Sequence, residues 1–256
     1  MKFIILGCGS SMGVPKADGD FGDCNPKEKK NFRSRCSALI SSKNQNILID
    51  TSPDLRTQLL SNNIKNVDRV LYSHMHADQM HGINDLRVFF LKKKNTIPVY
   101  ADKITSKYLL KTFSYCFKKT QKSYPAILNL NKVKKKMYFK KNKEKILIES
   151  LNVKHGLVNC VCYKINKKVI YISDVSKIDK KDYSFFKNIK FLVIDCFSFD
   201  SHPSHLNLQE SLDLINKFKP KKAILTNLHS TIDYNFLRKS LPNKIIPAFD
   251  GLTFRF

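Results

Sequence analysis

The chain has 256 residues, and its 46 Lys and Arg against 21 Asp and Glu give a formal net charge of +25. No apolar run approaches the roughly 18 residues of a membrane span, so we expect no membrane segment. The length suffices to bury one sizeable core, and we expect a single domain over residues 1–256. The positive charge favours anionic partners, phosphates or nucleic acid, although lysine-rich runs also form plain solvated surfaces.

Cysteine usage indicates a reducing compartment. The seven cysteines are dispersed and odd in number, and none forms a Cys-x-x-Cys pair, so they do not read as a disulfide framework. Too few apolar residues precede the Gly-Cys pair at 7–8 for a cleaved secretion signal. We therefore expect a cytoplasmic protein.

The first half of the chain alternates short strands with helices. Residues 2–6 predict a buried strand that runs into a glycine-rich turn, whose backbone amides could approach a phosphate. Ser52 is the expected cap of the first helix and Pro53 its first residue. Further strands are expected at 36–40, 46–50, 69–73 and 97–101, and helices at 51–63 and 104–117.

The second half follows the same pattern after a lysine-rich stretch. Asn207 and Glu210 have the spacing of a capping box at the start of an amphipathic helix, 207–218. A second helix is expected at 234–241, and strands at 145–155, 160–165, 168–174, 191–196, 222–227 and 252–256. Many strands with helices between them predict a layered α/β sandwich.

The stretch "SHMHADQMHG", residues 73–82, carries the clearest chemical signal. His74 and His76 follow a predicted strand at alternate positions, so both side chains can point to one side. Neutral imidazole is a preferred ligand of zinc and related ions. Asp78 adds an anionic oxygen that could hold a second cation nearby.

Three further residues stand where predicted strands end in other parts of the chain. They are His155, Asp174 and His229. Strand ends on a rigid sandwich are suited to a preformed metal site. Together with the first stretch, these residues complete a candidate set of ligands.

This ordered set, with "LID" ahead of it and "SHLNLQES" and "AILTNLHSTID" behind, resembles the metallo-β-lactamase superfamily, and within it the PhnP-like phosphodiesterases. The resemblance implies a four-layer αββα sandwich with a dinuclear metal site at one edge of its two sheets. It implies that the first ion is bound by His74, His76 and His155, that Asp174 bridges the two ions, and that the second is bound by Asp78 and His229.

The resemblance also implies supporting roles. Asp50 would be a partner that fixes a liganding histidine. His205 would be the general acid or phosphate contact, and we count it with Asp78 as catalytic. His202, three positions earlier, is expected to be accessory.

The sequence departs from the superfamily pattern at Gln79, where a histidine ligand is expected. An amide oxygen is a weaker ligand than imidazole, so we predict zinc or manganese at a tight first site and a weak second site. His81 shares a helical face with Asp78, but we do not expect it to replace the missing ligand. Only Cys24 and Cys36 remain where some relatives carry a cysteine knuckle, so we expect no structural zinc there.

The expected activity is hydrolysis of a cyclic or small phosphodiester by a metal-activated water. One alternative is a ribonuclease Z-like nuclease, in which the lysine-rich residues 132–145 would serve as an arm. Another is a degenerate member that binds an anion or nucleic acid without cleaving it. A phosphate-containing small molecule is the expected partner, and the oligomeric state stays open, a dimer included.

Overall fold

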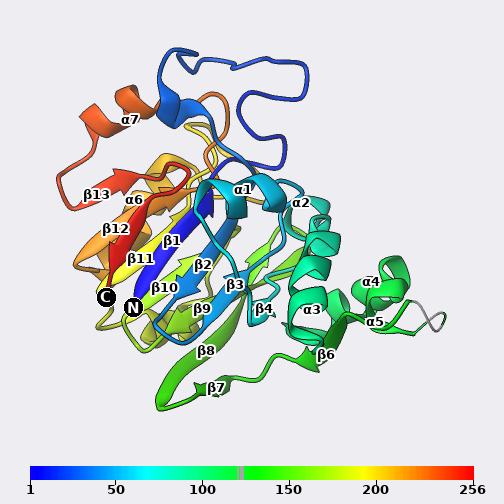
Figure 1. Ribbon diagram of the computed structural model, residues 1–256. Coiled ribbons are helices and arrows are strands. Elements are labelled where there is room, and N and C mark those ends of the chain that lie inside the picture. Colours follow the sequence, from blue (N-terminus) through cyan, green and yellow to red (C-terminus); the bar gives the residue numbers. More distant parts are fainter. Residues whose placement is uncertain (120, 122–123) are drawn as a thin grey trace.

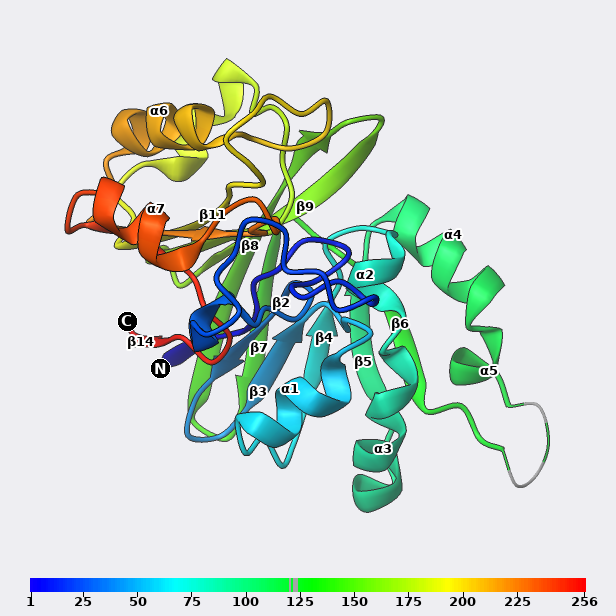
Figure 2. The same ribbon diagram turned by 90° about the horizontal axis from the view of Figure 1, so that it is seen from above.

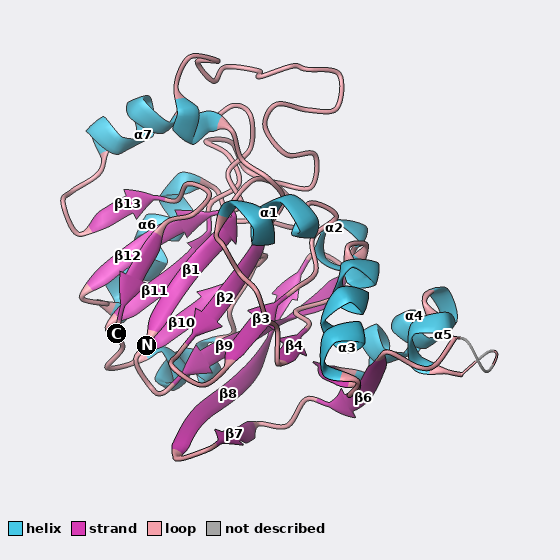
Figure 3. Ribbon diagram, in the orientation of Figure 1, coloured by secondary structure: helices cyan, strands magenta, loops and turns pink. Residues whose placement is uncertain are grey.

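The computed structural model describes residues 1–119, 121 and 124–256. Two sheets pack face to face, and helices cover both outer faces (Figure 1, Figure 3). The predicted four-layer αββα sandwich is confirmed.

The first sheet contains both chain ends, because its last strand pairs antiparallel with its first (Figure 1). Its order is β14-β1-β2-β3-β4-β5-β6. The strands are β1 (Lys2–Gly7), β2 (Ser37–Ser41), β3 (Asn46–Ile49), β4 (Arg69–Leu71), β5 (Ile97–Ala101), β6 (Leu128–Lys132) and β14 (Thr253–Arg255).

The second sheet is built entirely from the second half of the chain, in the order β13-β12-β11-β10-β9-β8-β7. Its strands β10, β11, β12 and β13 run parallel, and so their carboxyl ends share one edge. The strands are β7 (Lys136–Lys141), β8 (Glu144–His155), β9 (Val158–Ile165), β10 (Val169–Ile172), β11 (Phe191–Asp195), β12 (Lys222–Thr226) and β13 (Ile245–Pro247).

The outer layers are helical, and Figure 2 shows α1 and α3 on one side of the paired sheets and α6 on the other. The α-helices are α1 (Leu55–Ser61), α2 (Ala77–Met80), α3 (Arg87–Lys93), α4 (Lys103–Thr112), α5 (Ser114–Phe117), α6 (Leu208–Phe218) and α7 (Tyr234–Ser240). Short 3-10 helices span Lys29–Asn31, Ile83–Leu86 and Lys180–Phe186. Within the described ranges, no helix combines the length and the apolar character that crossing a bilayer requires.

The alternation of side chains along a strand explains how the layers form. In β1, Phe3 and Ile5 enter the core between the two sheets, whereas Ile4 and Leu6 pack under the helices of the first outer layer. Each strand buried on both faces therefore holds two layers together, which explains its unbroken apolar sequence.

Helix ends agree with the sequence in one case and differ in another. At α6 the capping box is confirmed, with Asn207 Oδ1 accepting from the Glu210 amide and Glu210 Oε2 accepting from the Asn207 amide. The predicted start of α1 is wrong, because Asp54 is the cap residue and Ser52 Oγ accepts from the Asp54 amide. Ser52 thus orders the turn before the helix.

The lysine-rich stretch is part of the second sheet. Its β7 pairs antiparallel with β8, buries Met137 and Phe139, and exposes Lys136, Tyr138 and Lys140. Lysines on an edge strand discourage pairing with another chain. Residues 136–141, the centre of the stretch 132–145 suggested as an arm, are thus paired within a sheet.

The glycine-rich turn after β1 uses its backbone amides within the protein. The Cys8 amide donates to Asp250 Oδ1 at 3.1 Å, and the Gly13 amide donates to the Ser10 carbonyl at 2.8 Å. Donors engaged in this way stabilise the turn and are not free to bind a phosphate.

Candidate metal centre

Three histidines from the two sheets converge at one point, and we call them the histidine cluster: His74, His76 and His155. His74 follows β4, His76 precedes α2, and His155 is the last residue of β8. The distance from His76 Nδ1 is 3.0 Å to His74 Nε2 and 3.2 Å to His155 Nε2. The three ring nitrogens are the arrangement expected of donors around one ion.

Two of the remaining ring nitrogens of the cluster contact residues outside it. His155 Nδ1 donates to the Ser204 carbonyl at 2.6 Å, while His155 Nε2 faces His76 Nδ1. His74 Nδ1 lies 3.0 Å from Ser73 Oγ. Burial lowers the pKa of His74 to about 3, so its imidazole is neutral at pH 7 and able to bind a cation.

Asp174, two residues after β10, brings a carboxylate to the cluster. Donor atoms of Asp174 lie within 4.8 Å of those of His74 and of His155. Burial alone would raise the pKa of Asp174, but the neighbouring histidines lower it, so the group is ionised. Asp174 Oδ2 is buried and has no hydrogen-bond partner among the described residues. Three imidazole nitrogens beside an unpaired carboxylate oxygen fit one divalent ion.

Asp50 supports the cluster through its neighbour. This buried residue has a φ of 62° directly after β3, and its Oδ1 accepts from the Ser73 amide at 2.7 Å. Burial raises the pKa of Asp50 well above its ordinary value. Because Ser73 Oγ lies 3.0 Å from His74 Nδ1, Asp50 is linked to His74 only by way of Ser73, and its orienting role stays a prediction.

Asp78 and Gln79 bond to each other. Gln79 Nε2 donates to Asp78 Oδ2 at 2.7 Å, and the Gln79 side chain is fully buried. Burial, with the nearby charge of Asp174, raises the pKa of Asp78 to about 6. Asp78 is in none of the groups of close donor atoms found among the described residues.

His229 and His81 also lie outside these groups. His229 Nδ1 is 3.1 Å from Thr231 Oγ1, and its ring packs on Phe197 with 4.9 Å between centroids. His81 Nε2 is 3.1 Å from the Tyr108 hydroxyl. Four of the six predicted ligands thus fall in groups of close donor atoms among the described residues, and Asp78 and His229 do not.

His205 lies beside the cluster, with its ring centroid 4.7 Å from that of His155. Its Nδ1 is 2.9 Å from Asp195 Oδ2, and its ring stacks on Phe197. Burial alone would lower the pKa of His205, but the hydrogen bond and charge of Asp195 raise it above the ordinary value. His202, predicted as accessory, accepts from the Ser204 amide at 3.3 Å.

Sequence reasoning missed four residues that touch this site: Ser73, Cys160, Asp195 and Asn227. Asp195 ends β11 and Asn227 follows β12. The signal that singled out Asp50 and Asp174, a polar residue where an apolar strand stops, was present at both. Applied to every strand, it would have found them.

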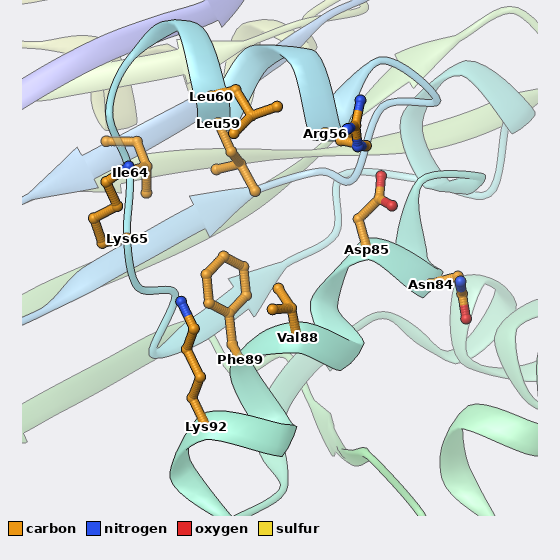
Figure 4. A pocket seen from close by; sticks show the side chains of 10 residues that line it. All are labelled: Arg56, Leu59, Leu60, Ile64, Lys65, Asn84, Asp85, Val88, Phe89 and Lys92. Carbon is orange, nitrogen blue, oxygen red and sulfur yellow. The ribbon is translucent and has the colours of Figure 1, made fainter.

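A separate hollow of about 420 Å³ lies between α1 and α3 (Figure 4). Its walls are mainly apolar, with Leu59 and Leu60 facing Val88 and Phe89. None of the predicted site residues lines it, so it is not part of the candidate metal centre.

The fold and the convergent donors define a class, the metal-dependent hydrolases built on the metallo-β-lactamase sandwich. A family model for the β-lactamase superfamily domain matches residues 45–227, and the chain belongs to that superfamily. The resemblance drawn from the sequence is confirmed.

Individual proteins add detail. A solved diphosphatase of the PhnP family is 27% identical, covers 100% of this chain and 97% of its own, and has a TM-score of 0.89. The short form of human tRNase Z is 13% identical, with coverage of 100% and 99% and a TM-score of 0.71, which shows the fold alone. A Porphyromonas gingivalis protein named octanoyltransferase is 30% identical over 98% of this chain, but the chain spans about half, 51%, of that relative's length.

Proposed function

We propose that this protein is a phosphodiesterase that cleaves a cyclic or small phosphoester at the histidine cluster. The observation that carries the proposal is the convergence of three imidazole nitrogens beside the unpaired Asp174 Oδ2. His74, His76, His155 and Asp174 would hold a zinc or manganese ion. Such an ion supplies a water acidic enough to attack at neutral pH and a positive charge beside the phosphoryl oxygens.

The other residues of the site have roles that follow from their contacts. The Asp195 carboxylate accepts from His205 Nδ1 and so orients the ring, with His205 Nε2 on its other side. Phe197 stacks on the same ring and limits its rotation. A protonated His205 held in this way is suited to give a proton to the leaving oxygen of the phosphoester.

A small substrate is favoured over a long RNA. The net charge of +25 and the relationship to a PhnP-family diphosphatase both support a phosphate substrate. The lysine-rich residues that could have gripped RNA as an arm are instead an edge strand. The relative named octanoyltransferase is about twice as long as this chain, so its name does not settle the substrate here. The test below therefore includes an acyl substrate.

The test is a substrate panel on the purified chain with added zinc or manganese. Its members are bis(p-nitrophenyl) phosphate, 2′,3′-cyclic nucleotides, a nucleoside diphosphate ester, a structured RNA and an octanoyl thioester. We expect turnover of the small phosphoesters and its loss in His76→Ala. Turnover of the thioester alone, or tight RNA binding with no turnover of any phosphoester, would contradict the proposal.

His81→Asn is a matched control for the histidine substitution. His81 pairs with Tyr108 outside the histidine cluster, so this variant should keep the wild-type rate. Equal losses in His76→Ala and His81→Asn would point to general damage to the fold.

A further inference from the structure

Asn227 lies beside Asp174 and contacts one of its two carboxylate oxygens. It follows β12 with a φ of 62°, a backbone region that asparagine tolerates, and it is 1% exposed. Its Nδ2 lies 3.2 Å from Asp174 Oδ1, 3.1 Å from Asp195 Oδ1 and 3.1 Å from His205 Nδ1. Two of these neighbours are carboxylate oxygens, which accept only, so the amide must present its NH2 group to them.

This contact makes the two carboxylate oxygens of Asp174 different from each other. Oδ1 accepts a hydrogen bond from the Asn227 amide, whereas Oδ2 has no partner among the described residues. A carboxylate that bridges two cations with one oxygen on each needs both of its oxygens free. With one oxygen already facing an N–H donor, Asp174 has one oxygen left for an ion.

Gln79 repeats the same arrangement at the other carboxylate expected to bind a second ion. Its Nε2 donates to Asp78 Oδ2 at 2.7 Å. The Gln79 backbone is fixed as well, because its carbonyl accepts from the Thr51 amide at 2.8 Å. We call Gln79 and Asn227, with the carboxylates they contact, the amide side of the centre.

His229 is not positioned to replace these amides. Its Nδ1 accepts from the Thr231 amide at 3.3 Å and lies 3.1 Å from Thr231 Oγ1. No donor atom of His229 belongs to a group of close donor atoms within the described part of the chain. The residues expected to bind a second ion are therefore not arranged to hold one.

We infer that this protein has a single-ion centre, in which the Asn227 amide takes the place of a second ion beside Asp174. Asn227 is then a positioning residue that holds Asp174 and the Asp195–His205 pair in one network. This inference rests on the proposed function, since it concerns the same centre.

The test is the number of ions that each full-length chain retains. The chelated protein is loaded with excess zinc, dialysed, and analysed by elemental and native mass spectrometry. We expect one ion per chain in the wild type and two in the double variant Gln79→His/Asn227→His. Histidine, like asparagine, is enriched in the left-handed backbone region, so position 227 should accept it.

His229→Ala is the matched control and should retain one ion, because His229 is not a ligand in this account. Two ions in the wild type would overturn the inference and leave the proposed function standing. One ion in the double variant would overturn the role of the amides, and none in the wild type would overturn the proposed function itself.

A second measurement does not depend on any variant. Manganese-loaded wild type should give the electron paramagnetic resonance spectrum of isolated ions at every loading up to saturation. A spin-coupled pair of manganese ions would overturn the single-ion centre.

Discussion

The histidine cluster and the amide side both adjoin Asp174, yet their donor atoms are arranged in opposite ways. In the cluster, ring nitrogens point at one another and Asp174 Oδ2 is left unpaired. On the amide side, the Asp78 and Asp174 oxygens already accept from amide groups. Buried polar groups normally find partners; the unpaired Asp174 Oδ2 is a carboxylate oxygen left for a cation, whereas the unpaired atom on the amide side is the neutral Gln79 Oε1.

Removing a ring nitrogen should give the largest effect. His155→Ala leaves two imidazoles for the ion, and we expect its affinity for zinc to fall by more than the roughly 10–100-fold seen when only an orienting partner is lost. Turnover of bis(p-nitrophenyl) phosphate should fall with it. Isothermal titration calorimetry with zinc measures the affinity. Wild-type affinity in this variant would show that the histidine cluster does not bind the ion.

Removing the acid beside the cluster should spare the ion. In His205→Gln we expect kcat to fall by about 10²–10⁴-fold, the usual contribution of a general acid, with one zinc per chain retained. The loss should be smaller for p-nitrophenyl esters than for alkyl esters, because nitrophenolate leaves without a proton. Equal losses for both leaving groups would argue against His205 as the acid.

Loosening an orienting contact should have a smaller effect. Ser73→Ala removes the hydroxyl 3.0 Å from His74 Nδ1, and we expect zinc affinity to fall by about 10–100-fold. Ser42→Ala is the control, because Ser42 bonds to Glu144 and Gln45. A loss as large in Ser42→Ala as in Ser73→Ala would show that the effect is not specific to His74.

A carboxylate elsewhere in the fold should affect stability and not the ion. Asp68 Oδ1 accepts from Lys93 and Lys141 at 2.8 Å each. Burial alone would raise the pKa of Asp68, but the two lysines hold it far below the ordinary value. A lowered pKa in the folded state stabilises the protein above pH about 4, and this contribution is lost as the pH falls further.

We therefore expect Asp68→Asn to lower the unfolding free energy at pH 7 by about 1.5–3 kcal/mol. The deficit should shrink below pH about 4, and zinc content should stay at the wild-type value. Denaturant unfolding at both pH values measures this, and an equal deficit at pH 3 and pH 7 would contradict the assignment.

Periodicity in the sequence predicted most of the fold. The apolar run of β1 and the cap at Asn207 depend on neighbours in sequence, and both are as expected. β7 was missed because its buried residues, Met137 and Phe139, stand between lysines and the run was interpreted as a charged surface. Which face of a strand packs against another sheet depends on the tertiary fold. The lysines therefore obscured the alternation of buried and exposed residues along β7.

The candidate site shows the same limit. Strand ends located His155 and Asp174, but after β12 they pointed to His229, whereas the side chain that contacts Asp174 is Asn227, two residues earlier. That choice depends on the backbone direction at the strand exit, where Asn227 has a φ of 62°. The effect of Gln79 likewise depends on the orientation of its amide toward Asp78, which no sequence pattern specifies.

X-ray absorption spectroscopy of the zinc-loaded protein tests the central claim most directly, because it reports the atoms bound to the ion. We expect a first shell of nitrogen and oxygen at about 2.0–2.1 Å with the scattering of three imidazole rings, and two rings in His155→Ala. A shell with no imidazole scattering, or one unchanged in that variant, would contradict the account.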